Sequence, residues 1–263
     1  MKITLFTSNQ SRHNYLINKL GKITKKLYVI QENDTRFPGL ISGHYPASDI
    51  FEKYFNKVNS AEKKIFGENY ISCRNINLLP LVEGDINKCK SNFLSDFLNS
   101  DMYIVTGSSY IKGDLADYLI KKKAISIHMG LAPYYRGTDC NFWALYDGNP
   151  ELVGATIYLL SKGLDTGKIL YHAISQIKND PFVYTMSCVK SAFDSLVERI
   201  KNNSIYKNEP IVQDKSKEVR YSKKRDFNEM IIKKFFKKKI NLDKKKLKIN
   251  LYKNPYILNK IKN

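Results

Sequence analysis

The chain has 263 residues, of which 43% are hydrophobic and 26% charged, a composition typical of a folded globular protein. It has no run of about 18 apolar residues, and its first residues turn polar too soon for a signal peptide. We therefore expect a cytoplasmic protein without a membrane span. The four cysteines form no C-x-x-C pair and have no histidine at metal-ligand spacing, so we expect reduced thiols and no metal site.

The formal net charge of +19 is concentrated after residue 200. Residues 201–263 hold 20 Lys and Arg against six acidic residues, whereas the first 200 residues hold 24 against 19. A basic segment of this kind can attract RNA, an anionic membrane or a nucleotide-linked substrate, or it can simply be a solvated surface. Since the first 200 residues are nearly balanced in charge, nucleic acid is not the partner that we expect.

Short apolar runs alternate with helical stretches along the first 130 residues. Strands are predicted at residues 3–8, 26–32, 75–83, 102–107 and 124–130. Helices are predicted between the strands: one that ends near Leu20, one within residues 36–67, one around Phe93 and one at residues 114–120. This order predicts an α/β, Rossmann-like fold, with a mostly parallel twisted sheet and helices on both faces.

The pattern changes after Gly148. Residues 153–161 and 168–176 are two predicted strands separated by KGLDTG, which favours a hairpin-like pair at the edge of the sheet. A helix at residues 183–201 then closes a main domain, residues 1–202. Residues 203–263 are predicted to form a basic, largely helical C-terminal extension, with Asp226 as the N-cap of an amphipathic helix. That helix could pack on the main domain, pair two subunits into a homodimer or touch an anionic surface.

Two candidate catalytic groups follow predicted strands, where an open parallel sheet binds its ligands. Ser126 and His128 project from the same face of one strand, just before the loop GLAPYYRG. Asp165 lies between Gly163 and Gly167, in the turn between the two later strands. Either group alone is weak evidence, because a strand-end histidine is often structural and an Asp in such a turn usually serves the turn.

Taken together, SIHMGLAPYYRG and the later VGATIYLLSKGLDTG resemble the folate-dependent formyltransferases. In that family a strand ends in Asn-x-His, and a G-x-D-T-G turn supplies an Asp. The resemblance is strong over residues 102–173 and general over residues 1–202. It implies transfer of a formyl group from N10-formyltetrahydrofolate to an amine, without a metal. His128 would take the proton of the attacking amine and help to hold the oxyanion, and Asp165 would orient His128 and the site's water.

Ser126 stands where the family has Asn. Its hydroxyl is shorter than the Asn amide, and loss of a well-aimed oxyanion donor typically costs ~10² to 10³ in rate. Three interpretations follow: a working enzyme that uses Ser126 or a water, a slow enzyme, or a non-catalytic folate or nucleotide-sugar binding protein. Because His128 and Asp165 are both present, we expect activity, lost in His128→Ala and unchanged or raised in Ser126→Asn.

The resemblance also suggests binding residues. The expected folate-binding residues lie in the loop after residue 107 and in the Asp-bearing turn: Ser109, Tyr110, Ile111, Lys112, Gly163 and Leu164. The expected acceptor-binding residues lie at a helix N-terminus suited to phosphate and in the YYRG loop: Ser8, Asn9, Arg12, Tyr135 and Arg136. Each of these residues could instead serve core packing, a helix cap or the packing of its own loop.

Three acceptors are familiar in the family: glycinamide ribonucleotide, methionyl-tRNA and nucleotide-linked amino sugars. HMGLAP departs from the H-P-S-L-L-P of the purine enzymes, and the residues after Asn202 look too few and too helical for the β-barrel of the tRNA enzymes. The YYRG, CNFWALYDG, TSNQSRH and RYSKKRDF segments are most similar to sugar N-formyltransferases of surface polysaccharide biosynthesis. We therefore expect a nucleotide-linked deoxyamino sugar as acceptor, with a methionyl-tRNA formyltransferase-like enzyme as the alternative.

Overall fold

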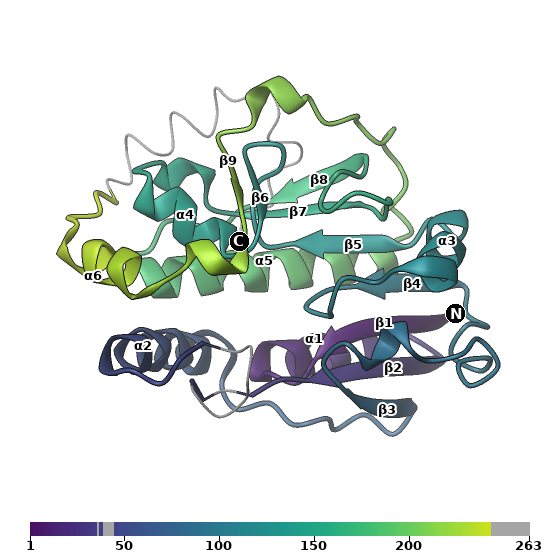
Figure 1. Ribbon diagram of the computed structural model, residues 1–263. Coiled ribbons are helices and arrows are strands. Elements are labelled where there is room, and N and C mark those ends of the chain that lie inside the picture. The colour runs from purple at the N-terminus through teal and green to yellow at the C-terminus, as the bar shows by residue number, and fades with distance from the viewer. Residues whose placement is uncertain (36, 39–44, 243–263) are drawn as a thin grey trace.

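The computed structural model describes residues 1–35, 37–38 and 45–242. Its main feature is a seven-stranded sheet in the order β3-β2-β1-β4-β5-β7-β8 (Figure 1). The strands are β1 (Lys2–Ser8), β2 (Lys26–Asn33), β3 (Ile76–Val82), β4 (Met102–Val105), β5 (Ile125–His128), β7 (Ala155–Leu159) and β8 (Ile169–Ala173). The first five are mutually parallel, and β7 and β8 add to β5 as an antiparallel pair. This arrangement confirms the predicted Rossmann-like fold and the edge hairpin.

Helices cover both faces of the sheet and its carboxyl end. They are α1 (Ser11–Gly21), α2 (Asp49–Phe66), α3 (Gly113–Lys121), α4 (Cys140–Tyr146), α5 (Pro181–Lys201) and α6 (Glu229–Lys237). Helices α1 and α5 pack on one face and α3 on the other, while α2, α4 and α6 gather beyond the strand ends (Figure 1). Two short strands, β6 (Tyr135–Gly137) and β9 (Arg220–Ser222), form a separate parallel pair.

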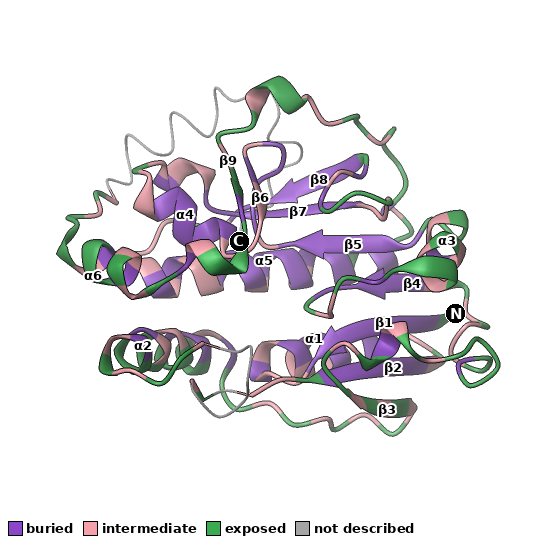
Figure 2. Cartoon of the chain, in the orientation of Figure 1, coloured by how far each residue is buried: buried purple, intermediate pink, exposed green. Residues whose placement is uncertain are grey.

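The side chains of β5 alternate between the two faces, and this alternation positions the site. Ile125 and Ile127 join the core under α1 and α5, so Ser126 and His128 point to the opposite face. All four residues are buried. Figure 2 shows the central strands buried throughout, whereas the edge strand β3 is largely half-buried or exposed. Pro80 has no N–H to donate. It is tolerated in β3 because this edge strand has no neighbour on its outer side that would need the hydrogen bond.

Two local sequence predictions were wrong. The segment around Phe93 forms a series of turns instead of a helix, and the carbonyl groups of Phe97 and Leu98 accept hydrogen bonds from side-chain hydroxyls, including that of Thr4. The N-cap of α6 is Asn228, whose side chain accepts from the Ile231 amide. Asp226 instead ends a short 3-10 helix (Lys224–Asp226) and accepts from the backbone amide of Lys223.

Residues 203–242 pack against the rest of the chain. The Arg220 guanidinium donates two hydrogen bonds to Asp147, at 2.8 and 2.7 Å, and stacks on the ring of Trp143. Phe227 and Phe235 join an aromatic cluster with residues of α2 and α4. Division at residue 202 stays a prediction, and part of the predicted extension, residues 243–263, lies outside the described residues, as do residues 36 and 39–44 of the predicted helical excursion. No described helix is long and apolar enough to cross a bilayer.

Candidate active site

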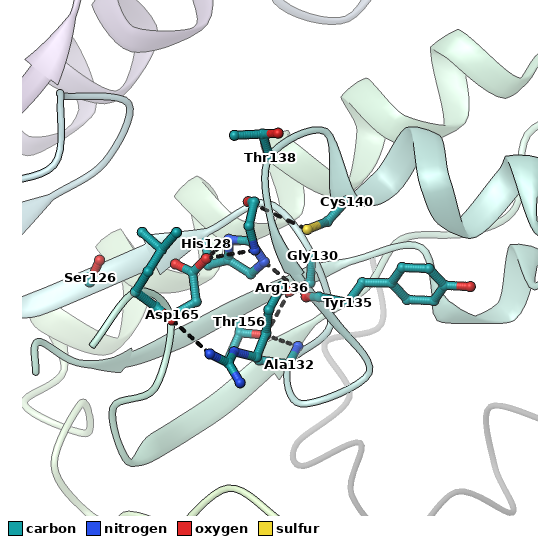
Figure 3. A network of polar contacts seen from close by, with 12 residues as sticks. Ser126, His128, Gly130, Ala132, Tyr135, Arg136, Thr138, Cys140, Thr156 and Asp165 are labelled. Atoms are coloured by element: carbon teal, nitrogen blue, oxygen red, sulfur yellow. Dashed lines mark hydrogen bonds and ion pairs between the residues drawn. The ribbon is translucent and has the colours of Figure 1, made fainter. Parts of the chain in front are cut away.

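His128 and Asp165 meet at the carboxyl end of β5, although 37 positions separate them in the sequence. His128 Nδ1 lies 3.3 Å from Asp165 Oδ2, and both side chains are more than nine-tenths buried (Figure 3). On the other side of the ring, His128 Nε2 lies 3.0 Å from the carbonyl oxygen of Tyr135. Since carboxylate and carbonyl oxygens only accept hydrogen bonds, both contacts are satisfied when each ring nitrogen carries a proton.

Asp165 is held in place by a backbone amide and a side-chain amide from two distant segments. Its φ of 53° lies in the left-handed region, which is uncommon for residues other than glycine and is frequent at functional sites. Its Oδ2 also accepts from the Gly137 amide at 3.1 Å. The side-chain amide of Gln213 donates to the carbonyl groups of Asp165 and Gly167, each at 2.8 Å. The turn that carries the carboxylate is therefore braced by the loop after β5 and by the segment after α5.

A chain of three hydroxyl and carboxylate groups ends on the same aspartate. Tyr158 lies directly opposite Ser126 in the β5–β7 register. The Ser126 hydroxyl donates to Tyr158 Oη at 3.0 Å, and the Tyr158 hydroxyl donates to Asp165 Oδ1 at 3.1 Å. Burial, and next the nearby Asp165 carboxylate, raise the pKa of Tyr158 well above its ordinary value, so the phenol keeps its proton. Asp165 thus accepts from Tyr158 through one oxygen and faces His128 with the other.

The loop between β5 and β6 is fixed against the edge hairpin. The Thr156 hydroxyl donates to the Gly130 carbonyl at 2.6 Å and accepts from the Ala132 amide at 2.8 Å. The His172 ring donates to the Ala132 carbonyl at 2.9 Å, and burial lowers the pKa of His172 to about 4. A Cβ at Gly130 would lie 2.6 Å from His128 Nε2. Only glycine therefore lets this loop pass so close to the histidine ring.

A cavity of about 610 Å³ opens beside these groups, a volume typical of small-molecule sites. Nine of the fourteen site residues predicted from the sequence line it: Ser8, Arg12, Tyr110, Ile111, Ser126, His128, Gly163, Leu164 and Asp165. The structure thus brings the three predicted catalytic residues together with parts of both predicted binding regions. The role of each residue stays a prediction.

Tyr135 and Arg136 do not line the cavity. The Tyr135 side chain is 1% exposed, and its hydroxyl accepts from the Asn149 side chain at 2.7 Å, so only its backbone carbonyl reaches the site. The Arg136 guanidinium pairs with Glu218 at 2.7 Å and donates to the Leu164 carbonyl at 3.2 Å. Arg136 therefore ties the chain after α5 to the Asp165 turn.

Three further predicted residues also lie off the cavity lining and make local contacts. Ser109 donates to the Glu32 carboxylate through its amide and its hydroxyl, at 2.7 and 2.9 Å. The Asn9 side chain donates to the Asp34 carbonyl at 3.1 Å, and Lys112 precedes the first turn of α3. Each of them fixes the backbone around the cavity.

The cavity lining is strongly acidic. Among the described residues that form it, six are acidic and one is an arginine or lysine: Glu32, Asp34, Glu62, Glu83, Asp139 and Asp165 against Arg12. Arg12 itself is paired with Glu62 at 2.9 Å. A phosphate near the end of β1 would therefore find the predicted guanidinium already neutralised, and the lining as a whole favours cationic or hydrogen-bond-donating ligands.

Sequence reasoning missed Tyr158, Asp139 and His13, all of which line the cavity. Tyr158 acquires its role from the antiparallel β5–β7 register, which no local pattern specifies. Asp139 follows the YYRG segment after one residue, and nothing in the local sequence marks it as a site residue. His13 lies in the first turns of α1, where its spacing looked like that of an ordinary core residue.

Comparison with known families supplies the deciding observation. Residues 96–195, which include Ser126, His128 and Asp165, match the family model described as formyl transferase. Over these residues the chain is similar to the formyl transferase family. This finding confirms the resemblance predicted from the sequence.

Curated relatives match only part of their own length. The methionyl-tRNA formyltransferase of Finegoldia magna is 36% identical over 88 residues, which cover 33% of this chain and 27% of that protein. Other relatives of the same name are matched over 15% to 42% of their length, so the chain spans less than half of each of them.

Solved structures share the fold of this region and its surroundings. A 4-N formyltransferase from Francisella tularensis has a TM-score of 0.51 at 20% identity, covering 86% of this chain and 77% of that one. The phosphoribosylglycinamide formyltransferase of Anaplasma phagocytophilum has a TM-score of 0.52 at 15% identity, covering 85% and 97%. The two scores are nearly equal although the two enzymes are named for different reactions, so fold similarity does not select an acceptor.

Proposed function

We propose that this protein transfers the formyl group of N10-formyltetrahydrofolate to the amine of a nucleotide-linked deoxyamino sugar, in surface polysaccharide biosynthesis. The observation that carries the proposal is the pairing of His128 with Asp165 at 3.3 Å on the wall of one large cavity, inside the region that is similar to the formyl transferase family. The proposal includes a cytoplasmic location, as expected from the sequence, and leaves a homodimer open.

The chemistry assigned to the paired residues is stabilisation of the oxyanion. Attack of an amine on the formyl carbon places negative charge on the formyl oxygen, which needs a donor aimed at it. His128 is the donor that we assign: its Nε2–H exchanges the Tyr135 carbonyl, 3.0 Å away, for the developing oxyanion, while Asp165 orients the ring from the Nδ1 side. Tyr158 donates a hydrogen bond to the other oxygen of Asp165 at 3.1 Å, and Ser126 donates in turn to Tyr158. The serine thus supports the carboxylate, whatever it contributes to the oxyanion.

Unpartnered polar atoms near the ends of β1 and β4 support a ligand with hydrogen-bonding edges, such as the pterin ring of the folate. Gln10 Oε1, His13 Nδ1 and Ser108 Oγ are buried without a hydrogen-bond partner among the described residues, and all three residues line the cavity. Burial lowers the pKa of His13 well below its ordinary value, so its ring is neutral and Nδ1 accepts or donates according to the tautomer. Buried polar atoms of this kind are normally satisfied, and a bound folate would satisfy them.

The acidic lining favours a small amine over a polyanion as the acceptor. A polyphosphate deep in the cavity would meet Asp34, Glu83 and Asp139, whereas an amine would be attracted as a cation. The phosphates of a nucleotide-linked sugar fit better at the rim. There Lys224 lies over the ring of the cavity residue Tyr45, with its Nζ 5.4 Å from the ring centre.

A methionyl-tRNA formyltransferase-like activity is the second candidate, because the curated relatives carry that name. The basic residues after position 200 would suit an RNA partner. A non-catalytic folate or nucleotide-sugar binding protein is the third candidate, and it rests on Ser126.

One screen separates the three candidates. Purified protein is incubated with N10-formyltetrahydrofolate and each acceptor in turn, and release of tetrahydrofolate is followed. The expected result is turnover with at least one nucleotide-linked deoxyamino sugar and none with methionyl-tRNA. Turnover with methionyl-tRNA, with a steep loss of binding as salt rises, would instead establish the second candidate. Tight folate binding without turnover on any acceptor would establish the third.

A further inference from the structure

Asp139 carries a buried carboxylate oxygen that has no partner. It occupies the N-cap position of α4 with φ 56° and ψ 31°, yet its side chain makes no capping hydrogen bond. Its Oδ2 is closed off from solvent and has no hydrogen-bond partner among the residues that the structure describes. An aspartate at this position usually accepts from the first helical amides, and a buried unpaired carboxylate oxygen is costly. The side chain is therefore held in an unfavourable state that a cationic ligand would relieve.

The position of Asp139 brings it to the reacting end of the cavity. It lines the same cavity as His128, and it follows Gly137, whose amide binds Asp165, by two residues. Two residues span at most about 7.6 Å between Cα atoms. Cys140 is affected by both carboxylates. The pKa of its thiol is raised well above its ordinary value, first by burial and then by the charges of Asp165 and Asp139. Both carboxylates therefore lie close enough to the Cys140 thiol for their charges to act on it.

The groups that face Asp139 leave room for a positive charge. Tyr45 and Tyr54 stand near it from the start of the α2 segment, and burial raises the pKa of both phenols, which keeps them neutral. Lys224 is the cation whose charge lowers the pKa of Asp139, but Lys224 is exposed at the rim and makes no ion pair with it in the described structure. A cation on the ligand can therefore be attracted to the Asp139 carboxylate.

His128 is poorly placed to collect a proton from the acceptor. Its two ring nitrogens face the Asp165 carboxylate and the Tyr135 carbonyl, so no lone pair of the ring is directed at the cavity. A base must reach the proton that it abstracts before its basicity matters. The Asp139 carboxylate lies on the cavity wall and offers another acceptor.

We propose that Asp139 binds the acceptor amine as an ammonium ion and takes the proton that this nitrogen must lose before it attacks. This assignment rests on the proposed function. The N–H bond breaks with its electron pair left on nitrogen, and a new O–H bond forms on Asp139. The freed pair then attacks the formyl carbon. When the carbon–N10 bond breaks, its electron pair takes up the second proton released by the acceptor nitrogen, and Asp139 returns its own proton to solvent.

The acidity of Asp139 suits this task. Burial raises the pKa of its carboxyl group from 3.8 to about 6, against a hydrogen bond with the Thr138 side chain and, next, the charge of Lys224. The group is therefore ionised at neutral pH, yet it is a stronger base than an ordinary aspartate. Binding of an ammonium ion should weaken as the pH falls through about 6, because protonated Asp139 loses its charge.

The test compares two ligands and three proteins. The ligands are a nucleotide-linked deoxyamino sugar and the same compound with a hydroxyl in place of the amine, and binding is measured by calorimetry with tetrahydrofolate present, so that no formyl group can be transferred. The proteins are the wild type, Asp139→Asn and Asp117→Asn. Asp117 is an exposed α3 residue paired with Lys162, and its variant makes the same chemical change away from the cavity.

The wild type and Asp117→Asn should bind the amine at least ~10-fold more tightly than the hydroxyl analogue, since a charge-assisted hydrogen bond is lost with the analogue. Asp139→Asn should reduce this preference to within about twofold and lower kcat/KM by ~10- to 100-fold. Asp139→Glu should restore part of both. Preference for the amine in the wild type should disappear below about pH 6, whereas the affinity for the analogue should not change.

Each remaining outcome separates this assignment from the proposed function. An undiminished preference for the amine in Asp139→Asn, or an equal affinity of the wild type for both ligands, overturns the role of Asp139 even if the wild type turns over. An Asp139-dependent preference without formyl transfer sustains the role of Asp139 and refutes the proposed function. If the wild type binds none of the amino sugars tested, both proposals fail.

Discussion

Replacing Asp139 by asparagine should stabilise the protein at neutral pH, and the gain should disappear on acidification. A carboxyl group whose pKa is about 6 instead of 3.8 has an ionised form that the fold disfavours by roughly 3 kcal/mol. Asparagine has nearly the same shape, carries no charge and tolerates the positive φ of this position. Because its amide is also buried, part of the gain is lost, and we expect a net increase of about 1 to 3 kcal/mol at pH 8.

The sign follows from proton binding. Between pH 4 and 6 the native wild type keeps a proton on Asp139 that the unfolded chain has released, so its free energy of unfolding falls as the pH rises. The asparagine variant lacks this dependence, and the difference between the two proteins should grow from near zero at pH 4 to its full value above pH 6. The buried, neutral rings of His13 and His172 destabilise both proteins on acidification, and their effect cancels in the difference.

Urea unfolding followed by circular dichroism at pH 4.5, 6 and 8 measures this difference. Asp117→Asn serves as the control, and as an exposed substitution it should change the free energy of unfolding by less than about 0.5 kcal/mol at every pH. A gain for Asp139→Asn that is equal at pH 4.5 and pH 8, or a loss at pH 8, would contradict the inference that this carboxylate is held unpaired. A pH-dependent gain combined with lower activity would mark Asp139 as a residue kept for function at the expense of stability.

Three further predictions concern the site and its support. His128→Ala should fold normally and lower formyl transfer by at least ~10³-fold, and wild-type turnover in this variant would exclude the mechanism. Tyr158→Phe and Ser126→Ala should each lower kcat by about 10-fold, and the double variant should be no worse than the poorer single one, because both act through Asp165. Multiplying effects would show that they act separately. Arg220→Met should lower the free energy of unfolding by about 1 to 2 kcal/mol in urea titrations, and Arg220→Lys should recover little, because the paired contact with a carboxylate needs the guanidinium.

The sheet and the catalytic pair were within reach of the sequence. Buried parallel strands are continuous apolar runs, and the alternation of side chains placed Ser126 and His128 on one face without a structure. The segment around Phe93 forms turns instead of the predicted helix, and the Phe97 and Leu98 carbonyl groups at its end accept from the hydroxyls of Thr4 and Tyr103. Tertiary contacts of this kind leave no local signature.

The binding residues were harder to predict. Arg136 and Tyr135 have side chains suited to a nucleotide. In the folded chain, however, Tyr135 is buried in the core and Arg136 pairs with Glu218. Asp139 was passed over because its importance lies in a missing hydrogen bond, which only three-dimensional packing reveals. Residue type indicates what a side chain is able to bind, and the fold decides whether that capacity is already used.

The two hydrogen bonds from Gln213 to the Asp165 turn bear on how the gene is trimmed for expression. A fragment ending at Asn202 would keep every strand of the large sheet, yet it would lose this amide together with the Glu218 partner of Arg136. Its aspartate loop would then be tethered at one side only, and a shortened protein of correct fold could be inert. Expression designs that preserve the chain through residue 242 retain both tethers and α6.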